Sequence, residues 1–87
     1  MTTPPRGWVA DGVWPHGRLA ADAPAAAVRL AATARRISEV VEQLGAAALA
    51  TAARVDRGEL DDLLAGTAWP TVHLIVGLET YLAETLW

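Results

Sequence analysis

The 87-residue chain contains no cysteine, no lysine and no phenylalanine. Without cysteine, neither a disulfide framework nor a thiolate metal site can form. No apolar run approaches the length of a membrane span, and residues 1–24 lack the charged start and apolar block of a signal peptide. We therefore expect a cytoplasmic protein that makes no membrane contact.

Groups that support catalysis or bind cofactors are also scarce. Ser38 is the only serine and has no paired base, and the side chains of the adjacent Asp61 and Asp62 diverge by ~100° on a helix, so they cannot share a substrate proton. His16 and His73 are too few ligands for a histidine metal site, and no glycine-rich phosphate loop is present. We predict no enzyme activity, no metal, no cofactor and no small-molecule substrate.

Positive charge is in short supply. Seven arginines face ten acidic residues, for a net charge of −3. Because a basic footprint is the first expectation for a nucleic-acid-binding protein, the total charge does not favour that function, and only a local distribution of charge can support it. The hydrophobic content of 53% is high, but much of it is alanine, which favours helices. A chain of this length predicts one domain with a small core.

Apolar residues at helical spacing predict four helices, over Ala25–Leu44, Ala46–Ala53, Arg57–Ala65 and residues 70–82. Gly45 separates the first two helices, and Pro70 suits the first turn of the last one. The residues expected to face the core are Leu30, Ala34, Ile37, Val41, Leu44, Leu49, Ala50, Ala53, Leu60, Leu63, Leu64, Val72, Leu74, Ile75, Val76, Leu78 and Leu82. We expect Leu86 and Trp87 to fold back onto the bundle.

The chain divides into an N-terminal arm, residues 1–24, and a helical domain, residues 25–87. Residues 1–5 are expected to be a loose terminus, and residues 16–24, rich in Gly, Ala and Asp, are expected to be a linker.

Within the arm, the Asp-Gly pair at 11–12 lies between two apolar segments, 8–10 and 13–14. Such a pair predicts a tight β-hairpin. The alternative is an irregular arm whose Trp8 and Trp14 cover apolar helix surface, because an isolated hairpin is marginally stable in water.

Residues 49–66 read as two short helices joined by a tight turn. Val55 supplies the apolar plug of the turn. Asp56 is a good N-cap, and Glu59 three residues later completes the spacing of a capping box. Gly66 ends the second helix. Two helices joined by a turn of three or four residues form a helix-turn-helix arrangement.

This stretch resembles the Cro-and-repressor-type (Xre) helix-turn-helix family. The family pattern is Leu-Ala, three residues, Gly-Val-Ser, three residues, Ile or Leu, two residues, an apolar residue, two residues and Gly. The residues that match this register are Leu49, Ala50, Val55, Leu60, Leu63 and Gly66. The segments that resemble an actinobacterial or actinophage branch of the family are Thr67-Ala68-Trp69-Pro70, Leu78-Glu79 and Leu86-Trp87.

The chain departs from the family pattern in three places. Arg54 stands where the family has a turn glycine, and Ala83 stands where it has a later glycine. The third departure is the second helix of the motif, which carries acidic residues where DNA readers usually carry Ser, Thr, Gln or Arg.

The resemblance implies an all-α, lambda-repressor-like bundle of four or five short helices behind the arm. It implies a sequence-specific transcriptional regulator, expected to be a repressor, that places its third helix in the major groove of double-stranded DNA. A homodimer is expected through the arm (Trp8, Val13, Trp14) or through the C-terminal end (Tyr81, Trp87).

The register also assigns the DNA contacts. Arg54 and Arg57 are the expected phosphate clamps, supported by hydroxyl groups and by the uncapped N-terminus of the second helix. The remaining candidates are the exposed positions of the third helix, where Glu and Asp can accept hydrogen bonds from cytosine. The candidate nucleic-acid-binding residues are Ala47, Thr51, Arg54, Arg57, Gly58, Glu59, Asp61, Asp62 and Thr67.

The same residues support an alternative function. Three acids within four positions of the third helix repel phosphate and suit a basic protein partner, as in an anti-repressor or a regulatory subunit. Arg35 and Arg36 could border a DNA site, but ion pairing with Glu39 is the favoured interpretation. For Trp69, packing of the loop onto the core is favoured over a contact with the sugar-phosphate backbone.

Overall fold

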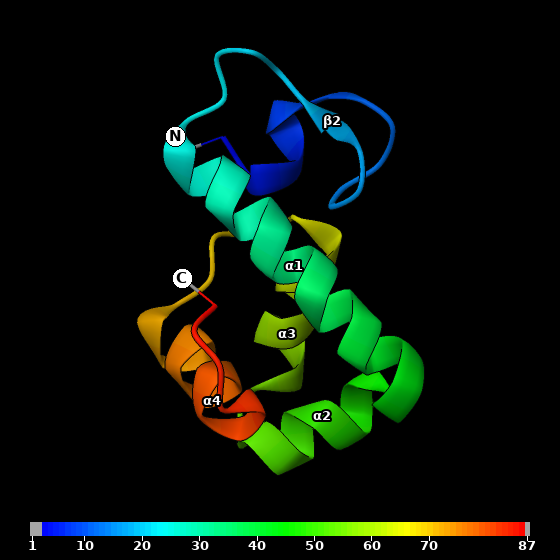
Figure 1. The fold of residues 1–87 in the computed structure, drawn as a ribbon, viewed down its shortest axis with the longest axis vertical. Coiled ribbons are helices and arrows are strands. Elements are labelled where there is room, and N and C mark those ends of the chain that lie inside the picture. The colour runs from blue at the N-terminus through cyan, green and yellow to red at the C-terminus, as the bar shows by residue number, and fades with distance from the viewer. Residues whose placement is uncertain (1–2, 87) are drawn as a thin grey trace.

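The computed structural model describes residues 3–86, which form a mostly helical bundle with one small two-stranded hairpin (Figure 1). The elements are the 3₁₀-helix η1 (Pro5–Trp8), the strands β1 (Val9–Asp11) and β2 (Arg18–Leu19), and the helices α1 (Ala25–Leu44), α2 (Ala46–Ala53), α3 (Arg57–Ala65) and α4 (Val72–Leu82). Helix α1 crosses the front of the molecule over α3, with the arm at one end and α2 at the other. The predicted helical bundle is confirmed, and so are the predicted bounds of its first three helices.

The core lies where the inner faces of the four helices meet. Its fully buried leucines and isoleucine are Leu30, Ile37, Leu49, Leu60, Leu63, Leu74 and Leu78. Each contributes roughly 1.5–3 kcal/mol by leaving water. These residues follow the predicted i, i+3/i+4 stripes, so local periodicity identifies most of the core.

Three residues predicted in the core are exposed instead. Leu44 is exposed as the last residue of α1, directly before the Gly45 cap. Val72 and Val76 are 79% and 51% exposed, because they lie on the side of α4 opposite Leu74. The sequence did not distinguish the two sides, since α4 is apolar on both.

Helix α4 begins two residues later than predicted. Pro70 does not open the helix; Thr71 caps it, and its Oγ1 accepts a hydrogen bond from the Leu74 N–H at 3.1 Å. A threonine side chain satisfies one of the free N–H groups of the first turn, which proline cannot do.

The arm differs from the predicted tight hairpin. Strand β1 pairs with β2, with Val9 opposite Leu19 and Asp11 opposite Arg18, so the segment between the strands spans residues 12–17. The predicted pairing of 8–10 with 13–14 is therefore wrong, and the predicted linker contains a strand.

The predicted loose terminus is also wrong at Pro5, which is buried in η1. Residues 1–2 and Trp87 lie outside the described residues, as do the predictions that fall on them.

Trp14 explains why the tight hairpin does not form. Its side chain is 6% exposed, and its Nε1 donates a hydrogen bond to the Leu63 carbonyl at 3.1 Å. The ring lies on Gly66, where an added Cβ would come within 2.7 Å of it. The segment after β1 therefore turns inward to cover α3, as the alternative interpretation of the arm proposed for this residue.

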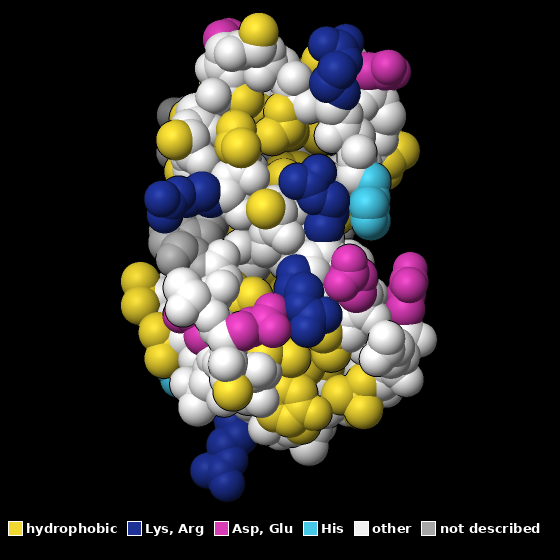
Figure 2. Space-filling view, viewed as in Figure 1, with side chains coloured by type: hydrophobic (Ala, Val, Ile, Leu, Met, Phe, Trp, Pro, Cys, Tyr) yellow, Lys and Arg dark blue, Asp and Glu magenta, His cyan; other side chains and the backbone are white. Residues whose placement is uncertain are grey.

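Charged side chains of both signs are interleaved on the face covered by α1 (Figure 2). Residues 1–38 contain five arginines and two aspartates, for a net charge of +3, whereas residues 39–87 contain two arginines and eight acids, for a net charge of −6. The visible face is thus no continuous basic surface, and the negative charge belongs mainly to the second half of the chain.

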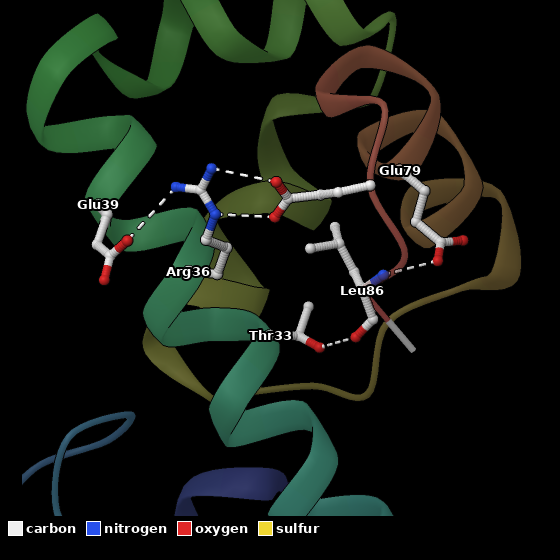
Figure 3. Close-up of polar contacts among 6 residues, drawn as sticks. Thr33, Arg36, Glu39, Glu79 and Leu86 are labelled. Carbon is white, nitrogen blue, oxygen red and sulfur yellow. Dashed lines mark hydrogen bonds and ion pairs between the residues drawn. The ribbon is translucent and has the colours of Figure 1, made fainter.

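The C-terminal segment is fastened to α1 by polar contacts (Figure 3). Arg36 holds Glu84 with two hydrogen bonds, of 2.8 Å from Nε and 3.2 Å from Nη2, and contacts Glu39 at 3.4 Å. Thr33 donates to the Leu86 carbonyl, and the Leu86 N–H donates to Glu79 at 2.8 Å. The predicted return of Leu86 to the bundle and the Arg36–Glu39 pair are confirmed, whereas Arg35 makes no ion pair with Glu39 among the described residues.

The Arg36–Glu84 pair makes stability depend on pH. The hydrogen bonds from Arg36 lower the pKa of the Glu84 carboxyl, and the same bonds raise the pKa of Arg36. Because the pKa of Glu84 is lower in the folded state, its stabilising effect is present above the unfolded pKa and is lost as pH falls through the folded value.

We expect Glu84→Gln to lower the melting temperature at pH 7, because the charged hydrogen bonds are lost. The difference from wild type should shrink as pH falls through the folded pKa of Glu84. The control is Glu42→Gln, which removes the same charge from an exposed position with no ion pair among the described residues. Equal effects of the two variants on thermal unfolding at pH 7 would contradict a specific role for Glu84.

The contact between Trp14 and Gly66 predicts a second, larger effect. Gly66 ends α3 in the left-handed region, at φ 69°, and an added Cβ there would lie 2.7 Å from the Trp14 ring. Gly66→Ala should cost about 2–4 kcal/mol, because Trp14 must move and the backbone is strained. In a Trp14→Ala background, only the backbone strain remains, and Gly66→Ala should cost about 1 kcal/mol. Urea unfolding measures both values. Equal losses in the two backgrounds would show that Trp14 does not pack on Gly66.

Candidate nucleic-acid interface

A three-residue connection, Arg54–Asp56, joins α2 to α3. Arg54 ends α2 in the left-handed region, at φ 58°, and its N–H donates to carbonyls of the last turn. Val55 is buried and lies so close to α4 that a Cβ added at Gly77 would be 2.6 Å from its Cγ1. The predicted plug is confirmed, and Gly77 is the reason that it can approach α4.

The N-terminus of α3 is capped as predicted by Asp56, whose Oδ2 accepts a hydrogen bond from the Glu59 N–H at 3.0 Å. The reciprocal half of the capping box is absent from the described hydrogen bonds. Instead, Glu59 accepts a hydrogen bond from the Thr71 hydroxyl at 3.2 Å. Glu59 is half-buried as a result, and it ties α3 to the cap of α4.

The orientation of α3 agrees with the sequence. Leu60 and Leu63 are fully buried, whereas Arg57, Gly58 and Asp61 are exposed along the opposite side. At its other end, Gly66 closes the helix at φ 69°, where the Arg6 N–H donates to the Gly66 carbonyl at 2.9 Å. Helix α3 is therefore anchored at both ends while its polar side faces solvent.

The polar groups on this side partly satisfy one another. Arg57 Nε lies 2.9 Å from Asp61 Oδ1, in a pair whose side chains are 52% and 53% exposed. Thr67 donates a hydrogen bond to Asp62 at 2.8 Å. Arg57 can release Asp61 at little cost, because exposed pairs of this kind contribute about 0.3–0.5 kcal/mol. Binding of a phosphate by Arg57 therefore remains chemically accessible.

The predicted contacts on α2 are accessible. Ala47 and Thr51 are exposed, and α2 begins at Gly45 without a side-chain cap. Its first N–H groups are thus available to an acceptor such as phosphate. Arg54 borders a hollow between α2 and α4 that His73 also lines.

Two hollows of about 410 Å³ each flank Val76 on α4, and sequence reasoning missed both of them. One lies between α2 and α4 and includes Arg54, and the other includes Trp69, Ile75 and Glu79. The sequence contains one sign of this second apolar side of α4, because Val72 and Val76 repeat at i, i+4 on the side of the helix opposite Leu74 and Leu78. A helix that is apolar all round commonly packs on two sides.

Trp69 packs partly onto the core, as favoured from the sequence, and its Nε1 donates a hydrogen bond to the Thr3 carbonyl at 2.9 Å.

In residues 3–86, no group of three His, Asp or Glu side chains is arranged to hold a metal ion. None of the helices in this part of the chain has both the length and the apolar character needed to cross a membrane.

No protein-family model, curated protein or solved structure matches this chain.

Proposed function

We propose that the chain is a sequence-specific DNA-binding regulator of the helix-turn-helix type, expected to act as a repressor. The observation that carries the proposal is the orientation of α3. Leu60 and Leu63 are fully buried, the Asp56 and Gly66 ends of the helix are anchored, and its polar side faces solvent. A rigid helix presented in this way suits entry into the major groove.

The backbone at two positions supports the resemblance on which the proposal rests. Arg54 and Ala83, which stand where the Xre family has glycines, are the non-glycine residues with positive φ among the described residues, at 58° and 54°. Glycine adopts this conformation without steric cost, whereas other residues pay about 1 kcal/mol. The chain therefore has the backbone that the family pattern requires even where it lacks the glycine.

In the proposed complex, each element has one task. The first N–H groups of α2, near Ala47, bind a backbone phosphate, and Arg57 binds another. Gly58 has no side chain, so the first turn of α3 can approach the bases closely. Asp61 and Asp62 accept hydrogen bonds from cytosine amino groups, which gives base preference without adding affinity.

Electrostatics predicts weak non-specific binding. Four acids, Asp56, Glu59, Asp61 and Asp62, lie on or beside α3, and Arg57 is the cation closest to them in sequence. With about two phosphates neutralised, the slope of log K against log salt is about −1.8, far smaller than for a strongly basic protein. Selectivity would then depend on base contacts more than on attraction to the backbone.

A second candidate function is binding of a basic protein, as by an anti-repressor or a regulatory subunit. The observation that favours it is the net charge of −6 in residues 39–87, which includes the acidic side of α3. In that case α3 would meet arginine and lysine side chains of the partner instead of base edges.

A salt series with random and selected duplexes tests the DNA proposal. We expect binding at low salt with a slope near −2. Arg57→Ala should weaken binding to all sequences alike and reduce the slope by about 1, because one phosphate contact is lost. Asp62→Asn keeps an acceptor for Thr67 and removes a charge, so it should strengthen binding to random DNA and change base preference.

The matched control is Asp22→Asn, which removes the same charge from an exposed position in the arm. It should leave base preference unchanged. If the wild-type protein binds no fragment of a genomic library at low salt, the DNA proposal fails, and binding of a basic protein becomes the favoured function.

A further inference from the structure

The outward side of α4 is an apolar surface that the fold leaves uncovered. Val72 and Val76 are 79% and 51% exposed, and Trp69, Pro70 and Ile75 line the hollow beside them. The opposite side of α4 is fully buried through Leu74 and Leu78. Helices that are apolar on both sides are usually packed on both sides.

Val76 is the central residue of this surface, because it lines both hollows. In a two-fold pair whose axis runs parallel to α4, Val76 of one copy packs against Val76 of the other. Every other contact of such a pair is made twice.

The charges at the two edges of this surface, Arg54 and Glu79, are complementary in such a two-fold pair. Arg54 borders the hollow on the α2 side and has no carboxylate partner among the described residues. Glu79 borders the other hollow, and only its Oε2 is engaged, by the Leu86 N–H. A two-fold axis along α4 brings the Arg54 edge of each copy against the Glu79 edge of the other.

We propose that the outward side of α4, with Val72 and Val76 at its centre and Arg54 and Glu79 at its edges, is a homodimer interface. This inference specifies the surface for the homodimer expected from the resemblance. It places the interface beside Tyr81 at the C-terminal end and not on the arm. It does not depend on DNA binding and is tested without DNA.

The size of the surface limits the strength of the dimer. Helix α4 has 11 residues and is therefore about 16 Å long. A stable interface buries about 800 Å² per partner, roughly one sixth of the 5131 Å² that this chain exposes. We therefore expect a weak dimer whose population rises with protein concentration.

Sedimentation equilibrium over a concentration series tests the interface with a pair of matched variants. Val76 and Val28 are both 51% exposed, but Val28 lies on α1. Val76→Asp should raise the dimer Kd at least about tenfold, because a charge enters the centre of the interface, whereas Val28→Asp should change it less than about twofold. Thermal unfolding verifies that both variants are folded.

A charge exchange tests the edges. Arg54→Glu and Glu79→Arg should each raise the Kd a few-fold by placing like charges together, and the double variant should recover most of the loss. A protein that stays monomeric up to about 1 mM, where a dimer of millimolar Kd is well populated, would overturn the proposal. Equal effects of Val76→Asp and Val28→Asp, or no recovery in the double variant, would overturn it as well.

Discussion

The contact between Val55 and Gly77 positions the helices around which the rest of the structure is built. Val55 occupies the turn between α2 and α3, and it reaches α4 only because Gly77 has no side chain there. The turn is thereby held against a third helix, and Val55 belongs to the same buried cluster as Leu49 and Leu60. Any residue larger than glycine at 77 would push the turn outward and change how α3 is presented.

Local signals in the sequence predicted most of the helical framework. Helix bounds follow from apolar periodicity and from caps such as Asp56 and Gly66, which act within one turn of the chain. The start of α4 was predicted less accurately because Pro70 and Thr71 are competing start signals, two residues and one residue before Val72. Burial of Leu60 and exposure of Arg57 followed from the same periodicity, so the orientation of the candidate site was predictable.

Contacts between distant parts of the chain were not predictable in this way. Trp14 binds a carbonyl 49 residues away, and Arg36 binds a carboxylate 48 residues away. Neither partner is marked by spacing or composition. The same reason explains the error on Val76: both sides of α4 are apolar, and only the position of the other helices decides which side is buried.

Two properties of α3 oppose each other. Its anchored ends and buried leucines present a polar surface rigidly, which suits recognition of a regular partner such as duplex DNA. Its acids reduce attraction to phosphate, although Arg57 and Thr67 already bind two of them. In the proposed DNA complex, selectivity would come from base contacts, and binding to unrelated DNA would be weak.

The most direct test of this account is an NMR titration of the ¹⁵N-labelled protein with a duplex selected from a random pool. The account predicts that the largest amide shifts occur in residues 57–62 of α3 and in the first turn of α2. Shifts confined to α1 or to the arm, or no shift at low salt, would contradict it.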